Sequence, residues 1–240
     1  MRTTERRQLK QDRFAQTAAE TYSWAAEHQN TLIWGGLALA IIAAIYFGLT
    51  TYMTNQSNRA NSDLAAAMAT YNAGLGAANP AQPNEQTFPT ATDRAKAAHQ
   101  KFEEVADKYG HTDAGKIARY MGGVTAQQMG DNAMAERELK RAIDNGGTDV
   151  AALARMALAG VYRSTNKDQQ AIEQYKYVID HPTNSVGKTA AELELASLYE
   201  AKNPQEAIKI YQEIQKDKTN VQSPAAQQAA ARLATLKPGQ

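Results

Sequence analysis

The segment MALAGVYRSTNKDQQAIEQYKYVID, residues 156–180, decides the fold, because ELASLYEAKNPQEAIKIYQEIQKD, residues 194–217, repeats its pattern. In both segments, small and aromatic residues recur at helical spacing on each side of a polar turn. The matching pairs are Leu158 and Leu195, Ala159 and Ala196, Tyr162 and Tyr199, Ala171 and Ala207, Tyr175 and Tyr211, and Val178 and Ile214. One such helix pair cannot bury its apolar face alone, so the repeat predicts pairs that stack in chain order.

Two earlier copies of the second helix extend the pattern toward the N-terminus. Ala135, Leu139 and Ala142 lie 36 residues before Ala171, Tyr175 and Val178, and Ala98, Phe102 and Val105 lie 37 residues before the first set. Capping residues separate the helices: Asp131 or Asn132, Asn184 or Ser185, Asn203 before Pro204, and Ser223 before Pro224. Connections this short favour antiparallel neighbours, and no window predicts a strand. We therefore expect an all-α, antiparallel helix-pair solenoid.

The pattern resembles the tetratricopeptide repeat, which carries Leu-Gly and then Tyr on its first helix, and Ala followed by an aromatic residue on its second. The resemblance covers about residues 93–217. It departs from the family at 113–145, where Gly122-Gly123 and Ala126 replace Leu-Gly and Tyr. The family's Trp is also missing. The resemblance implies a protein-binding domain in which Ala135, Ala171 and Ala207 lie where the two helices of a pair touch.

Before the repeats, LIWGGLALAIIAAIYFGLTTYM, residues 32–53, contains no charged side chain. At about 1.5 Å per residue this run spans roughly 33 Å as a helix, enough for the hydrocarbon core of a bilayer. A cleaved signal peptide is the alternative, but its apolar region is about 7–15 residues long and ends at a small-x-small site. The run is longer, and TNQSNRANSD after it offers no such site. A single retained transmembrane helix is the favoured interpretation.

Charge predicts the orientation of this helix. The first 13 residues carry five basic and two acidic groups, whereas after the span only Arg59 precedes Arg94. Cytoplasmic flanks collect Lys and Arg, so the N-terminus is expected in the cytoplasm and the large domain outside it. Within the span, Gly36, Ala40, Ala44 and Gly48 recur every four residues. Such a stripe allows close packing of a second membrane helix, although Ala and Gly are also common in membrane helices generally.

These features divide the chain into five segments. They are a cytoplasmic leader (1–31), the transmembrane helix (32–53), a first helix with a Pro-rich loop (54–92), the repeats (93–221), and a capping helix with a tail (222–240).

Composition argues against several functions. Residues 54–240 hold 21 basic and 21 acidic side chains, and a neutral domain is a poor nucleic-acid binder. The chain has no cysteine, and its four histidines (His28, His99, His111 and His181) have no partners at metal-ligand spacing. We expect these histidines at helix ends or on the surface. Phosphate-loop, GxSxG and HExxH motifs are absent from the sequence. The sequence therefore predicts no enzyme, no metal, no cofactor and no small-molecule substrate.

A binding surface is the more informative hypothesis. In stacked helix pairs the first helix of each pair lines the concave face, and its mixture of aromatic, apolar and polar residues suits an extended or helical peptide. By the repeat frame, the predicted groove consists of Tyr120, Val124, Gln127, Met156, Gly160, Arg163, Leu193, Ser197 and Glu200. The alternative is that Tyr120, Met156 and Leu193 only pack within the solenoid.

The layout as a whole, with Trp24 and His28 just before Leu32, also resembles a narrower family, the YfgM-like ancillary subunits of the bacterial SecYEG translocon. That resemblance implies a single-pass inner-membrane protein with a periplasmic repeat domain. Its expected partners are translocon subunits, periplasmic chaperones or exported chains. A scaffold for cell-envelope assembly or division would share the same fold and remains the alternative.

Overall fold

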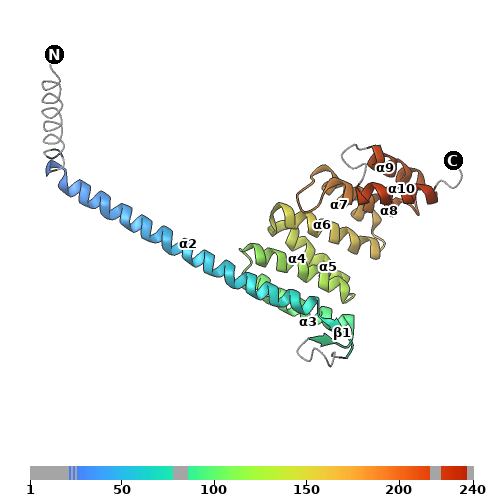
Figure 1. The fold of residues 1–240 in the computed structure, drawn as a ribbon, viewed down its shortest axis with the longest axis horizontal. Coiled ribbons are helices and arrows are strands. Elements are labelled where there is room, and N and C mark those ends of the chain that lie inside the picture. Colours follow the sequence, from blue (N-terminus) through green and yellow to red (C-terminus); the bar gives the residue numbers. More distant parts are fainter. Residues whose placement is uncertain (1–21, 23, 25, 78–85, 217–222, 237–240) are drawn as a thin grey trace, which may run out of the picture. The chain divides into compact units, whose positions relative to one another are not determined.

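The computed structural model describes residues 22, 24, 26–77, 86–216 and 223–236, and the described part is almost entirely helical (Figure 1). The helices are α2 (Gln29–Tyr71), α3 (Ala91–Lys108), α4 (Asp113–Gln128), α5 (Asn132–Asn145), α6 (Gly147–Ser164), α7 (Asp168–Asp180), α8 (Lys188–Tyr199), α9 (Pro204–Lys216) and α10 (Pro224–Leu236). Most of the predicted leader, part of the Pro-rich loop and the C-terminal tail lie outside the described residues.

The helices begin where the sequence supplies capping oxygens. The Met134 amide donates to Asp131 Oδ1 (2.9 Å) at the start of α5, and the Ala226 amide donates to Ser223 Oγ (3.1 Å) at the start of α10. The predicted start of α8 at Asn184 or Ser185 is wrong, because α8 begins at Lys188. The preceding residues form a turn instead: the Thr183 amide donates to the Val186 carbonyl (2.9 Å), and the Val186 side chain is buried.

The chain divides into two compact units, residues 1–55 and 56–240. In the second unit, each helix from α3 to α10 packs against the next helix along the chain. The predicted small positions Ala135, Ala171 and Ala207 are completely buried, which allows the two helices of each pair to approach closely. Tyr175 and Tyr211 are buried in the same cores, as the repeat predicts.

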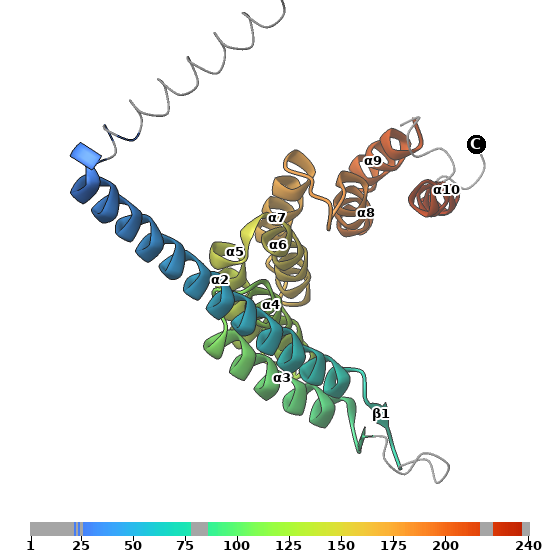
Figure 2. The same cartoon turned by 60° about the vertical axis from the view of Figure 1, so that its left-hand side comes forward.

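The first helix of the second unit is the C-terminal part of α2, which lies beside α3 (Figure 2). Ala60 and Ala67 pack in one buried cluster with Phe102 of α3, and the Tyr109 hydroxyl donates to Asp63 Oδ2 (2.9 Å). Helix α2 continues through the polar residues 54–62, which contain neither Gly nor Pro to interrupt it. The sequence predicts a first helix before the Pro-rich loop, but it does not show that this helix and the apolar run form one element, α2.

A short parallel strand pair, which the sequence does not predict, follows α2. Strand β1 (Gly74–Leu75) pairs with β2 (Thr87–Phe88), with Gly74 opposite Thr87. Two-residue strands leave no periodicity to detect, because alternation becomes visible only over about four residues or more. The pair joins the two ends of the Pro-rich loop before α3.

Candidate protein-binding groove

The first helices of three successive pairs, α4, α6 and α8, carry the predicted groove, with Glu200 at the C-cap of α8. All nine predicted residues are half-buried, between the exposed surface and the closed cores. Gly160 of α6 faces Gln127 of α4, because a β-carbon placed on Gly160 would lie 3.7 Å from Gln127 Nε2. The adjacent first helices α4 and α6 therefore bring their predicted residues together.

An open cavity of about 550 Å³ lies at the centre of this surface. It is lined by Met156, Gly160, Arg163, Ser164, Tyr175 and Glu194. Its volume falls within the range of about 300–1,000 Å³ that ligand pockets occupy. Three of the six lining residues belong to the predicted groove. The other three were not predicted as groove residues, and they come from the end of α6, from α7 and from α8.

The polar groups of the cavity bind one another. Arg163 Nη1 donates to Glu194 Oε2 (2.8 Å), and Arg163 Nη2 lies 3.5 Å from Ser197 Oγ. Burial is the main cause that raises the Tyr175 pKa, and the nearby Arg163 opposes this rise. The contacts of Arg163 with Glu194 and Ser197 join α6 to α8 at one end of the cavity, which Tyr175 of α7 also lines.

Several predicted residues also have structural roles, and Met156 packs against two core clusters. Burial, and to a lesser extent Tyr71, raises the pKa of Tyr120, which packs against two core clusters. Leu193 packs on the cluster that contains Tyr211. Glu200 accepts a hydrogen bond from the Tyr211 hydroxyl (2.7 Å) and lies 3.5 Å from Arg232 Nε, so its carboxylate binds α9 and α10.

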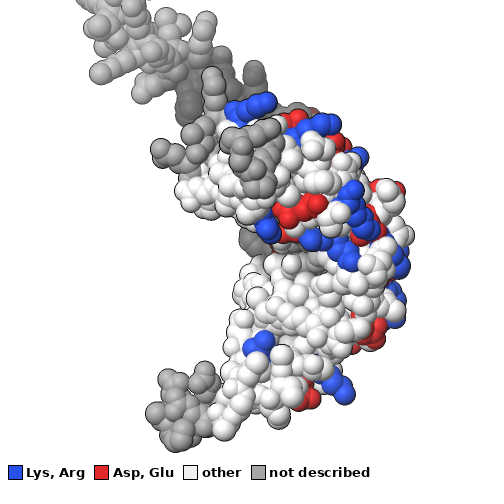
Figure 3. Space-filling view, turned by 90° about the vertical axis from the view of Figure 1, so that its right-hand side faces the viewer, with Lys and Arg blue, Asp and Glu red and all other residues white. Residues whose placement is uncertain are grey.

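The surface extends beyond α4 to the end of α2. Gln128 Nε2 donates to the Tyr71 hydroxyl (2.8 Å), so Tyr71 adjoins the first helix of the next pair. The sequence could have predicted this extension. In the repeat frame, the helix that contains Tyr71 forms a pair with α3, so it is the first helix of that pair. In Figure 3 the hollowed left-hand side of the second unit carries few charged side chains, and most Lys, Arg, Asp and Glu lie toward the opposite edge.

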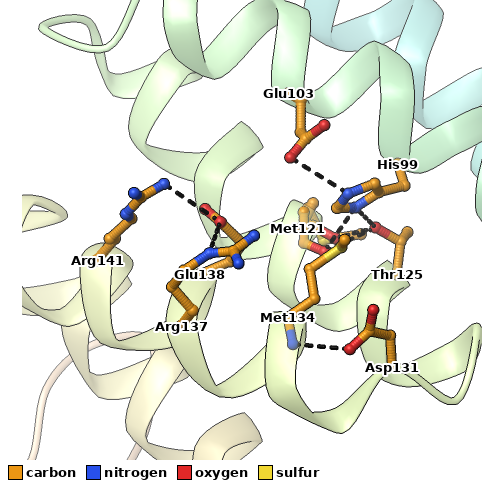
Figure 4. A network of polar contacts seen from close by, with 10 residues as sticks. His99, Glu103, Met121, Thr125, Asp131, Met134, Arg137, Glu138 and Arg141 are labelled. Carbon is orange, nitrogen blue, oxygen red and sulfur yellow. Dashed lines mark hydrogen bonds and ion pairs between the residues drawn. The ribbon is translucent and has the colours of Figure 1, made fainter.

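Away from the groove, a polar network joins α3 to α4, and separate polar contacts lie within α5 beside it (Figure 4). Its central residue, His99, is 5% exposed, so its predicted surface position is wrong. His99 Nδ1 lies 3.0 Å from the Gly122 carbonyl oxygen, and Nε2 lies 3.3 Å from Glu103 Oε1. A lone polar residue on a helix does not reveal a carbonyl acceptor 23 residues away. Among the described residues, no group of three or more His, Cys, Asp or Glu side chains is arranged to bind a metal.

The small-residue stripe lies in the first unit, on α2. Gly36, Ala40, Ala44 and Gly48 are all exposed, and a β-carbon on either glycine would meet no atom within 4 Å. The apolar window of α2 has a mean hydropathy of 2.2, and none of it is buried. By length and composition this helix can cross a membrane.

Comparisons with known proteins agree with the repeat architecture. A family model described as a tetratricopeptide repeat-like domain matches residues 22–181, two thirds of the chain. No curated protein matches. Two crystal structures match that are described as the nearly identical TPR-like repeats of a Podosopora anserina kinesin light chain. One is a glutamine-to-methionine variant, and both have a TM-score of 0.54 and 16% identity. Each match covers 75% of this chain, with 85% of the variant and 86% of the other, and at this identity it shows the fold alone.

Proposed function

This chain belongs to the tetratricopeptide repeat-like domain family, and on that premise we propose that it is a membrane-anchored adaptor that binds other proteins. The observation that carries the proposal is the open cavity of about 550 Å³ that α6, α7 and α8 line. The repeat fold is typical of proteins that use an extended surface for binding. In this proposal the domain has no catalytic role, and its partners are polypeptides rather than nucleic acids or small molecules.

The proposed location is the bacterial inner membrane, with the N-terminus in the cytoplasm and the repeat domain in the periplasm. The excess of basic residues before the apolar run supports this orientation. The layout of leader, span and repeat domain, together with Trp24 and His28, supports partners of the SecYEG translocon, namely its subunits, periplasmic chaperones or exported chains. In this proposal, the membrane anchor holds the adaptor close to the translocon, where exported chains enter the periplasm.

Protease accessibility tests the orientation. Protease added to intact spheroplasts should digest the repeat domain and leave a cytoplasmic marker protein uncut. Digestion of the domain only after the membrane is permeabilised would contradict a periplasmic location.

Site-specific cross-linking tests the groove. A photo-cross-linking amino acid at Met156 should capture protein partners in intact cells, because this side chain lines the cavity. The matched control is the same amino acid at Glu173, an exposed position of α7 that does not line it. Translocon subunits, chaperones or exported chains captured from position 156 alone would support the proposal. Capture of envelope-assembly or division proteins would instead support the scaffold function. An absence of captured partners would refute the proposal that the groove binds proteins.

A further inference from the structure

Gly160 lies inside α6, yet the packing of the helices does not explain it. Its φ is not positive, and a β-carbon there would meet only Gln127 Nε2, at an ordinary contact distance of 3.7 Å. Gly123 differs, because its β-carbon would lie 2.6 Å from Leu139 Cγ. Glycine weakens a helix interior relative to alanine. Gly160 therefore carries a cost to α6 that close helix packing does not require.

The missing side chain opens the groove. Gly160 lines the cavity together with Met156, one turn earlier on the same helix, and Tyr175 of α7. A residue with a long side chain at position 160 would project into this space, since the backbone already leaves room for its β-carbon. The position therefore controls the depth of the cavity without contributing to a closed core.

The charges around the cavity limit what can bind there. Among the described lining residues the cation is Arg163, which lies 2.8 Å from Glu194, and both of its terminal guanidinium nitrogens have polar partners. Glu200, the other charged residue of the predicted groove, is held by Tyr211 and Arg232. A charged ligand side chain would have to break the Arg163–Glu194 pair or lie beside a like charge, whereas an uncharged one leaves these contacts intact.

We propose that Gly160 is a specificity-determining residue, which forms a subsite for an uncharged, apolar side chain of an extended polypeptide segment. The segment places that side chain over Gly160, between Met156 and Tyr175, and its backbone polar groups lie near Ser164 and Gln127. This inference rests on the proposed function, since it specifies which kind of polypeptide segment binds in the groove.

The test uses the full chain in lipid nanodiscs and three fluorescein-labelled peptides of equal length. One peptide has a central Leu flanked by Ser, Asn and Gly, and in the other two this Leu is Asp or Lys. We expect the Leu peptide to bind at least about tenfold more tightly than either charged peptide by fluorescence anisotropy. Gly160→Leu should lower the affinity for the Leu peptide by about tenfold or more, because the new side chain occupies the subsite.

Gly187→Leu is the matched control. Gly187 is exposed before α8, its φ of −75° suits any residue, and a β-carbon there meets no atom within 4 Å. This variant should bind as the wild type does. Neither leucine variant should unfold at a lower temperature than the wild type, because Gly160→Leu removes a glycine from the interior of α6. Gly160→Ala provides a second variant in case the leucine disturbs α6. It leaves most of the space open, so it should keep most of the affinity for the Leu peptide.

Three results would overturn the inference: equal or tighter binding of a charged peptide, unchanged binding by a folded Gly160→Leu variant, and no binding of any peptide. The proposed function is tested separately. If cross-linked partners are recovered from position 156 of both the wild type and the Gly160→Leu variant, the adaptor function is supported and the proposed subsite is refuted.

Discussion

Leu139 occupies the space that a side chain on Gly123 would need: a β-carbon there would lie 2.6 Å from Leu139 Cγ and 2.7 Å from Leu139 Cδ2. This contact joins α4 to α5 at a position where the later repeats carry Ala159 and Ala196. Gly123→Ala should therefore lower the free energy of unfolding by about 1–3 kcal/mol, because the α4–α5 contact must open.

Gly122 provides the control for that prediction in the same helix. A β-carbon on Gly122 would meet no atom within 4 Å. Gly122→Ala should be neutral or should stabilise the protein by up to about 1 kcal/mol, through helix propensity alone. Urea unfolding of the full chain in detergent, followed by circular dichroism, measures both variants. Equal effects of the two substitutions would contradict the assigned contact.

Glu136 should make stability depend on pH in the acidic range. Its carboxylate oxygens lie 2.7 Å from Lys140 Nζ and 2.9 Å from Lys167 Nζ. Hydrogen bonds from Lys140 and then Lys167 lower the Glu136 pKa from 4.5 to about 2. Because the folded pKa lies below the unfolded pKa, the stabilisation is present above about pH 4.5 and is lost as the pH falls toward 2.

Glu136→Gln should accordingly cost about 1 kcal/mol at pH 7, a value that allows for screening by solvent. The difference from wild type should shrink between pH 4.5 and pH 2. Glu173→Gln, at an exposed position of α7, should change stability by less than about 0.5 kcal/mol at every pH. Urea unfolding across this pH range is the measurement, and a pH-independent effect of Glu136→Gln would refute the assignment.

His99 should contribute through its Nδ1 proton. The Gly122 carbonyl can only accept, so the 3.0 Å contact places that proton on Nδ1, and Thr125 Oγ1 lies 3.2 Å from the same nitrogen. His99→Ala should destabilise the protein by about 2–3 kcal/mol, through lost packing and lost hydrogen bonds. His99→Asn should recover part of the loss, since the asparagine amide can donate from nearly the same place.

His181→Ala is the matched control for His99. His181 is exposed, although its ring stacks on Tyr177 at 4.4 Å. Its removal should cost less than about 0.5 kcal/mol in the same urea experiment. If His99→Ala and His181→Ala had similar effects, the buried network would have no special importance for stability.

The small-residue stripe on α2 predicts a contact in the membrane. Gly36→Leu or Ala40→Leu should abolish co-purification of a membrane partner in mild detergent, because bulky side chains prevent close approach of two helices. Ala38→Leu, on the opposite face of the helix, should leave co-purification unchanged, and all three variants should insert normally. Unchanged co-purification of the two stripe variants would make α2 an anchor only.

The repeat and its caps could be predicted because they depend on residues close in sequence. Asp131 and Ser223 cap helices where expected, and Ala135, Ala171 and Ala207 are buried where their spacing places them. The residues that complete the cavity were harder to identify. Tyr175 and Glu194 line the cavity, but the repeat frame assigns neither of them to the groove.

The remaining errors involve contacts between distant residues. The burial of His99 depends on the carbonyl of Gly122 on another helix, and the late start of α8 depends on the turn that buries Val186. Glu200 lies at the position that the repeat frame gives it, but Tyr211 and Arg232 bind its carboxylate. A repeat frame predicts where a residue lies on its helix. It does not predict which neighbour binds the end of a long side chain.

The packing of each helix against the next in sequence has a mechanical consequence. In such an array, stability is nearly a sum over neighbouring units, so one end can open while the rest stays folded. A force pulling the C-terminus away from α2 would meet the helix pairs one after another, beginning with α10 and α9. The domain would lengthen in small steps rather than rupture at once, and it would act as an extensible tether whose innermost helices keep their fold.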